Sequence, residues 1–255
     1  MDILLLQTDI EWQSPDKNRK HIEDIVDSSP LADIIILPEM FTTGFCTLPV
    51  DVAEKADTDT LAWMQHLAGA KKAAIAGSIV VEENGKYYNR FYFVKPCGNY
   101  SVYNKRHLFS FAGEDREYTA GDERVIVEYC GCRILLQVCY DIRFPVFSRN
   151  RDDYDMIIYV ANWPVQRIGA WTALLPARAI ENQCYVAGVN RTGSDPVAKY
   201  SGGTVLIDFF GRPAVSAGFD REEAVLGTVN IQSIKNFRKK FPAIDDADQF
   251  TLEYH

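Results

Sequence analysis

Three side chains that can take part in chemistry, Glu39, Lys105 and Cys139, each follow a short run of residues typical of a β-strand. These runs cover residues 34–37, 100–104 and 133–138. Strand ends that meet at one edge of a sheet are where α/β folds place their sites. The sequence therefore predicts that a carboxylate, an ammonium and a thiol converge from three distant segments.

These three groups together suit nucleophilic attack on a carbonyl carbon. A free thiol has a pKa of about 8.5 and needs help to lose its proton at neutral pH. Glu39 could accept that proton and later return it to departing ammonia, a contribution of roughly 10²–10⁴-fold. Lys105 and the backbone N–H of Tyr140 could stabilise the negative oxygen of the tetrahedral intermediate.

Each of these residues also has an ordinary structural explanation. A cysteine inside an apolar run is usually a small core residue. A glutamate after proline at a strand end is commonly a cap, and a single lysine in a loop usually faces solvent. Their separations along the chain have no local meaning, so the residues alone leave both interpretations open.

Composition excludes several classes of protein. The 255 residues are 47% hydrophobic, enough for a large core, and the net charge of −8 argues against a nucleic-acid partner. The sequence contains no run of 18 apolar residues, so no membrane span is expected, and the N-terminal segment has no basic leader. The six cysteines fit no zinc or redox spacing, which predicts a cytoplasmic protein with reduced thiols and no metal. No G-x-G-x-x-G follows a strand, so no cofactor is expected.

The order of apolar and amphipathic segments predicts an α/β fold. Continuously apolar runs such as 34–37 are typical of strands that are covered on both faces. Helical spacing of apolar residues predicts helices at 58–72, 170–182 and 231–241. No linker divides the chain, so we expect one domain over residues 1–255, with 243–255 as a tail that docks on a neighbouring surface or subunit.

The stretches LPEMFTTGF, YNKRHLF and VCYDIRFP, in this order, resemble three motifs of the nitrilase (carbon–nitrogen hydrolase) superfamily. The resemblance extends from QTDIEWQ near the start to roughly Phe241. It implies a four-layer α-β-β-α sandwich and a homodimer or larger homo-oligomer. It also implies that Glu39 is the general base, Lys105 the transition-state stabiliser and Cys139 the nucleophile that forms a thioester acyl-enzyme.

Further residues are assigned through the same resemblance. Glu114 matches a second glutamate of the family, expected to hold Lys105 and orient the substrate, although an exposed acid is the alternative. Arg143 is expected to bridge carboxylates beneath the site. The expected substrate pocket is lined by Asn162 and Trp163, with apolar walls that core packing could equally explain, from Phe41, Phe109 and Phe111.

The chain is most similar to the omega-amidase branch of this superfamily, on the stretches VCYDIRFPVFSRN, DYDMIIYVANWP and RAIENQCYVAG. This implies hydrolysis of the terminal amide of a small dicarboxylate monoamide such as 2-oxoglutaramate, with release of ammonia. The cation for the substrate carboxylate stays open among Arg167, Arg191 and Lys199.

Other functions remain as alternatives. Within the superfamily they are an N-carbamoyl amidohydrolase, an aliphatic amidase or a nitrilase. A papain-like enzyme would use His107 as the base for Cys139. A protein of a different class would be a non-catalytic α/β binding module.

Overall fold

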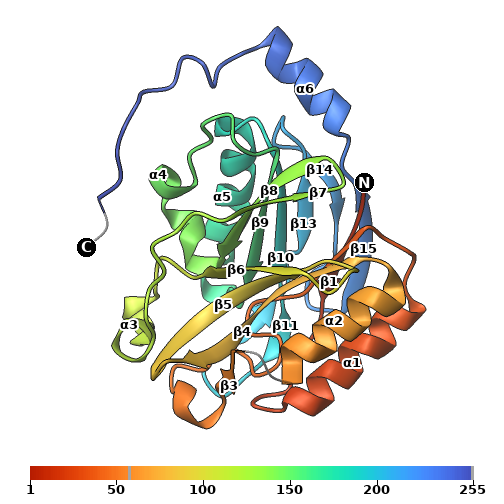
Figure 1. Ribbon diagram of the computed structural model, residues 1–255, viewed down its shortest axis with the longest axis vertical. Helices are drawn as coiled ribbons and strands as arrows, with labels where there is room; N and C mark the ends of the chain where they lie inside the picture. The colour runs from red at the N-terminus through yellow and green to blue at the C-terminus, as the bar shows by residue number, and fades with distance from the viewer. Residues whose placement is uncertain (57–58, 254–255) are drawn as a thin grey trace.

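Two β-sheets packed face to face form the centre of the molecule, with helices over their outer faces (Figure 1). The computed structural model describes residues 1–56 and 59–253. The first sheet has the strand order β15-β1-β2-β4-β5-β6, and β3 pairs with β4. Its strands are β1 (Asp2–Gln7), β2 (Ile34–Ile36), β3 (Glu54–Lys55), β4 (Ala74–Glu83), β5 (Lys86–Val94), β6 (Tyr100–Asn104) and β15 (Glu223–Thr228).

The second sheet has the order β14-β13-β10-β9-β8-β7, and β11 and β12 form a separate hairpin. The strands of this sheet are β7 (Ile126–Tyr129), β8 (Cys132–Val138), β9 (Met156–Ala161), β10 (Tyr185–Asn190), β13 (Val205–Ile207) and β14 (Pro213–Ser216). The hairpin consists of β11 (Thr192–Ser194) and β12 (Lys199–Ser201). These two short strands lack the apolar periodicity by which longer strands are recognised.

The α-helices flank the sheets at both outer faces. They are α1 (Pro15–Ser28), α2 (Asp59–Lys71), α3 (Glu114–Glu117), α4 (Pro145–Ser148), α5 (Ile168–Glu181) and α6 (Ile231–Lys240). The described residues also form short 3₁₀ turns: η1 (Pro49–Asp51), η2 (Ser110–Ala112), η3 (Cys139–Arg143) and η4 (Val165–Arg167).

Alternation along β1 shows why its sequence is continuously apolar. Ile3 and Leu5 pack in the core between the two sheets, whereas Leu4 and Leu6 pack against α1 and α2. Successive side chains of a strand point to opposite faces, so a sheet covered on both faces needs apolar residues at every position. On the far side, Trp171 of α5 packs on the second sheet. The predicted α-β-β-α order of layers is confirmed.

Strand direction gathers several loop segments at one edge. In the first sheet β2 is parallel to β4, and β6 has the same direction because two antiparallel pairings separate it from β4. In the second sheet β8, β9 and β10 are mutually parallel. The predicted convergence of strand ends therefore has its physical basis in the parallel centre of each sheet.

Of two local features that the sequence predicts, one differs in the structure and the other is confirmed. Pro176 suggests a kink or a later start, yet α5 runs through it. The Thr172 carbonyl, which Pro176 cannot bond, lies on the exposed side of the helix where water can satisfy it. The turn at Asn84-Gly85, both at positive φ, joins β4 to β5 in a hairpin as the Asn-Gly pair predicts.

The C-terminal segment leaves α6 as an extended trace (Figure 1). It returns to the loop after α4, where the guanidinium carbon of Arg151 lies 5.1 Å from the ring centre of Phe250. Position 58, the expected start of the second helix, and residues 254–255 of the expected tail lie outside the described residues. In the parts of the chain that are described, no helix is long and apolar enough to cross a membrane, and no cluster of three or more metal-ligating acid, His or Cys side chains occurs.

Candidate active site

The structure brings Glu39, Lys105, Glu114 and Cys139 together at one edge of the two sheets. Glu39 lies in the turn after β2, Lys105 directly follows β6, and Glu114 begins α3. Cys139 is the first residue of η3, directly after β8, and has a φ of +46°. This left-handed conformation is uncommon for a residue with a Cβ, and such strain tends to occur at functional sites.

Lys105 is clamped between two carboxylates. Its Nζ lies 3.0 Å from Glu39 Oε1 and 2.9 Å from Glu114 Oε2, and all three side chains are fully buried. Burial alone would lower the pKa of Lys105, but the charges of Glu114 and Glu39 offset burial and raise this pKa above its ordinary value. The lysine is therefore a permanent cation in this site.

The two carboxylates have further donors. Glu39 Oε1 accepts from Asn89 Nδ2 at 2.7 Å, and Glu39 Oε2 accepts from the backbone N–H of Asn162 at 2.8 Å. Glu114 Oε2 accepts from the backbone N–H of Phe109 at 2.6 Å. Burial raises the pKa of Glu114, and the charge of Lys105 acts against that shift.

Cys139 is held as a neutral thiol. Burial raises its pKa well above the ordinary value, the charge of Glu39 adds to this, and the charge of Lys105 acts in the opposite direction. The residue keeps some exposure because it lines a pocket. The other five cysteines are also free thiols, but they lie outside this cluster of charges.

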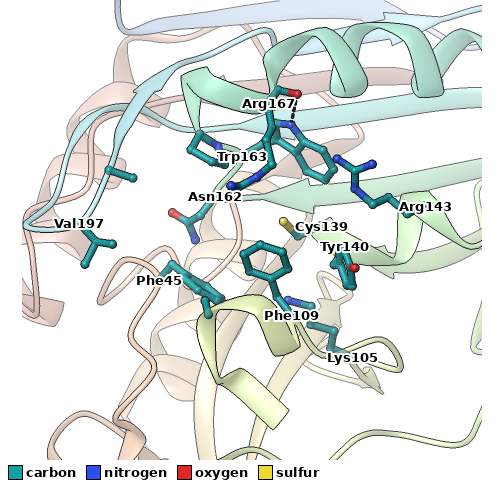
Figure 2. A pocket seen from close by; sticks show the side chains of 13 residues that line it. Phe45, Lys105, Phe109, Cys139, Tyr140, Arg143, Asn162, Trp163, Arg167 and Val197 are labelled. Carbon is teal, nitrogen blue, oxygen red and sulfur yellow. Dashed lines mark hydrogen bonds between the residues drawn. The ribbon is translucent and has the colours of Figure 1, made fainter.

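The pocket above Cys139 has a cavity of about 90 Å³ (Figure 2). Aromatic side chains make up much of its wall, and two guanidinium groups, those of Arg143 and Arg167, lie on either side of Trp163 in Figure 2. Arg143 lies 5.1 Å from the ring centre of Trp163, and Arg167 lies 4.9 Å from that of Phe109. A larger outer cavity of about 630 Å³ shares Phe109 and Arg167 with the pocket and leads toward the surface.

Asn162, Trp163 and Phe109, all expected at the pocket, lie on its wall. Tyr140 also lines it, and its N–H belongs to the first turn of η3, where backbone donors have no partner within the helix. Phe45, which the sequence interpretation missed, lies over the Lys105 ammonium with 5.5 Å from Nζ to the ring centre.

Two of the expected pocket walls are wrong. Phe41 is fully buried in the core beneath α2, 5.8 Å from the ring of Trp63, because the turn at Met40 directs it away from the pocket. A Cβ built on Gly77 would lie 3.0 Å from the Phe41 ring, so a larger residue there would have to push this ring aside. Phe111 is 85% exposed and lines only the outer cavity, since it sits in η2 on the surface.

The expectation that Arg143 bridges carboxylates beneath the site is also wrong. Arg143 ends η3 and faces the pocket, and among the described residues it has no carboxylate within ion-pair distance. The supporting role belongs to Arg178, whose guanidinium donates to the Ile142 carbonyl at 2.6 and 2.9 Å.

The three cations considered for the substrate carboxylate lie in different surroundings. Arg167 lines the pocket. Arg191 is fully buried, where it donates to Asp9 Oδ1 at 2.6 Å and stacks on Tyr200. Lys199 is an exposed residue of β12. Of these three, Arg167 is therefore the one placed to meet a ligand.

His107 is engaged away from the thiol. Its Nδ1 lies 2.8 Å from Asp141 Oδ1, and its ring stacks on Phe144 at 3.9 Å. Asp141 is a buried hub, since it also accepts from Tyr103 Oη and from the backbone N–H groups of Val138 and His107. The charged neighbours of Cys139 are Glu39 and Lys105, so the arrangement does not favour a Cys–His pair.

Known proteins are similar to this chain in sequence and in fold. The carbon-nitrogen hydrolase family profile matches residues 5–239. A protein from Yersinia enterocolitica named omega-amidase YafV is 42% identical, with 99% of this chain and 98% of that protein covered. A 2-oxoglutaramate amidase from Bacillus subtilis is 35% identical over 96% of each. The crystal structure of XC1258 from Xanthomonas campestris, described as a CN-hydrolase superfamily protein with an arsenic adduct in the active site, has a TM-score of 0.96 at 42% identity, covering 99% of both chains.

Proposed function

Because the chain belongs to the carbon–nitrogen hydrolase family, we propose that it hydrolyses the terminal amide of a small dicarboxylate monoamide, such as 2-oxoglutaramate, to the acid and ammonia. The enzyme is a cysteine-dependent amidohydrolase. The contacts and charges of the site support a role for each of its residues.

The first step is attack by Cys139 on the amide carbonyl carbon. The thiol is neutral at rest, because its pKa is raised by burial and by the charge of Glu39. Glu39 is therefore the general base that accepts the thiol proton as the S–C bond forms. Its two oxygens are held by Lys105, Asn89 and the Asn162 N–H, which fixes the carboxylate beside the thiol.

The negative oxygen of the tetrahedral intermediate needs a preorganised partner. The Lys105 ammonium and the backbone N–H of Tyr140 supply it, since both residues line the pocket with Cys139. Collapse of the intermediate breaks the C–N bond, and the proton held by Glu39 passes to the departing nitrogen to give ammonia. Water then attacks the resulting thioester with Glu39 as base, which releases the acid and restores the thiol.

Glu114 acts through Lys105. Two hydrogen bonds of 3.0 and 2.9 Å from the ammonium fix the lysine, and the bond from the Phe109 N–H ties Glu114 to the pocket loop. With Glu114 in place, Lys105 stays charged when Glu39 takes up the thiol proton. The lysine is then available to the oxyanion at the moment that the charge develops.

A single observation carries the substrate class: two guanidinium groups, Arg143 and Arg167, line an aromatic pocket without a carboxylate partner among the described residues. Half-buried cations of this kind favour an anionic ligand, and arginine suits a carboxylate because two N–H groups can bind both oxygens. The cavity of about 90 Å³ fits a short acyl chain between Cys139 and these cations.

An ammonia-release assay tests this function. Purified protein is compared on 2-oxoglutaramate, glutaramate and succinamate, on neutral amides of the same chain length, on N-carbamoyl amino acids and on nitriles. We expect preference for the anionic amides and no turnover by the Cys139→Ala variant. Brisk turnover of a carbamoyl compound, a neutral amide or a nitrile without turnover of the monoamides would contradict the substrate class, and inactivity on all of them would favour a binding module.

We also infer that the protein is a homodimer or larger assembly of the cytoplasm. Val146 on α4 and Ile180 on α5 are about half exposed on two helices that contact η3, which supports pairing through these helices. Six free thiols support a reducing compartment. Light scattering of the purified protein, with Ile180→Glu as the disrupting variant, tests the assembly.

A further inference from the structure

Asn89 lies between the two carboxylates that share Lys105. It is a fully buried residue of β5, and its Nδ2 donates to Glu39 Oε1 at 2.7 Å and to Glu114 Oε1 at 3.3 Å. The backbone carbonyl of Asn89 accepts from the Lys105 N–H at 2.9 Å. One residue thus bonds both buried carboxylates through its side chain and the backbone of the lysine between them.

Simple packing does not explain an asparagine at this position. The Oδ1 atom of Asn89 is buried and has no hydrogen-bond partner among the described residues. An unsatisfied polar atom destabilises a folded protein, and an apolar side chain of similar shape would avoid that penalty. What the asparagine adds is the pair of N–H donors that it directs at the carboxylates.

The net charge of the two carboxylates and the ammonium explains why the N–H donors of Asn89 are useful there. Two buried carboxylates and one ammonium carry one excess negative charge, and proton uptake by a carboxylate would remove it. A donor that bonds the ionised form opposes that proton uptake. The shorter bond goes to Glu39, the group that must be ionised for attack.

We propose that Asn89 is a positioning residue that keeps Glu39 ionised and ready to accept the Cys139 proton. The inference rests on the proposed role of Glu39 as the base. The other groups that face Glu39 are Lys105 after β6, Glu114 of α3, Cys139 of η3 and the N–H of Asn162 after β9, with minor influence on the hydroxyls of Tyr118 and Tyr200.

The test is the acid limb of the pH profile of kcat/KM for Asn89→Leu and Asn89→Asp. Loss of a donor to the ionised form disfavours that form, so the limb should move to higher pH for leucine. The aspartate variant adds a third carboxylate and should move the acid limb to a higher pH than the leucine variant does. We expect kcat to fall more than KM changes, because Asn89 sits behind the carboxylates and not on the pocket wall.

Asn150→Asp is the matched control. Asn150 is a buried asparagine that bonds the carbonyls of Tyr154 and Asn182, away from the charged cluster. This control should lower the melting temperature without moving the acid limb. The proposal would be overturned if the acid limb of the kcat/KM profile shifted equally in the control, or if it stayed in place in both Asn89 variants.

Alkylation of Cys139 by iodoacetamide, followed by mass spectrometry, provides a readout that needs no substrate. The pH at which alkylation begins should rise in the Asn89 variants in the same order, since Glu39 must be unprotonated to accept the thiol proton. An unchanged onset in folded variants would refute the role of Asn89. If the parent protein fails to hydrolyse the monoamides while the onset still moves, the substrate assignment fails and the role of Asn89 stands.

Discussion

Replacing Arg167 by glutamine should separate anionic from neutral substrates. In the structure its guanidinium stacks on Phe109, and no carboxylate among the described residues neutralises it. The substitution removes a charge without leaving a buried partner unpaired, so the fold should lose little stability. Its effect should appear in catalysis, and only where the substrate carries a carboxylate.

The magnitude follows from the bond that is lost. A hydrogen bond to a charged group contributes about 1.5–3 kcal/mol, which corresponds to a fall in kcat/KM of about 10- to 150-fold. Arg167 is half-buried at the junction with the outer cavity, so screening by water places the expected fall near the lower limit, about 10-fold. Arg143 lies deeper beside Trp163 and should show the larger loss.

The assay compares kcat/KM for glutaramate with that for pentanamide, a neutral amide of the same length. Arg167→Gln and Arg143→Gln should lower only the first, and Arg167→Lys should restore part of it, because lysine keeps the charge without the planar fork. The double variant shows whether both guanidiniums bind one carboxylate, in which case their effects are not additive. Equal losses on both amides would refute carboxylate recognition and make these arginines structural.

Further predictions concern the thiol and its surroundings. Glu39→Gln and Cys139→Ala should each lower kcat at least about 100-fold with little change in melting temperature, since each keeps most of the packing. Raising the pH above about 8.5 should lower the free energy of unfolding, by up to about 1.4 kcal/mol per pH unit for each buried thiol, because the raised pKa values of Cys139 and Cys184 keep them protonated when folded while they ionise in the unfolded chain. Urea midpoints from pH 7 to 10 measure this, and a midpoint that stays constant or rises would contradict it. His107→Ala should keep most of the turnover, whereas Asp141→Ala should lose most of it. Asp141 accepts four hydrogen bonds around the nucleophile turn, and the His107 substitution removes only the one from the imidazole ring. Steady-state ammonia release measures this, and a higher rate for Asp141→Ala than for His107→Ala would contradict the prediction.

The convergence of Glu39, Lys105 and Cys139 could be predicted because each one ends a strand. A strand is a short-range pattern, and parallel strands bring their ends to one edge whatever the separation along the chain. Continuous apolar runs also predicted sheets with helices outside, since such runs require cover on both faces, and the motif resemblance implied the four-layer order. Motif resemblance then selected these three residues from many polar groups at strand ends.

The direction of side chains after a turn could not be read from the sequence. Phe41 and Arg143 each lie within four residues of a predicted site residue, yet one points into the core and the other into the pocket. The difference depends on the backbone of single residues, such as the positive φ of Met40, and periodicity holds no information on it. Asn89 left a weaker signal, as a polar residue within the aromatic stretch YYNRFYF.

The left-handed backbone of Cys139 means that selection for protein level and selection for catalysis favour different residues at this position. A strained residue of this kind destabilises the fold by about 1–3 kcal/mol, and glycine would relieve most of that strain. In a library of all substitutions at position 139, a screen for cellular protein level should therefore favour glycine over cysteine. A screen for amide hydrolysis should retain cysteine alone, so a lineage that no longer needed the reaction would drift toward glycine at this position.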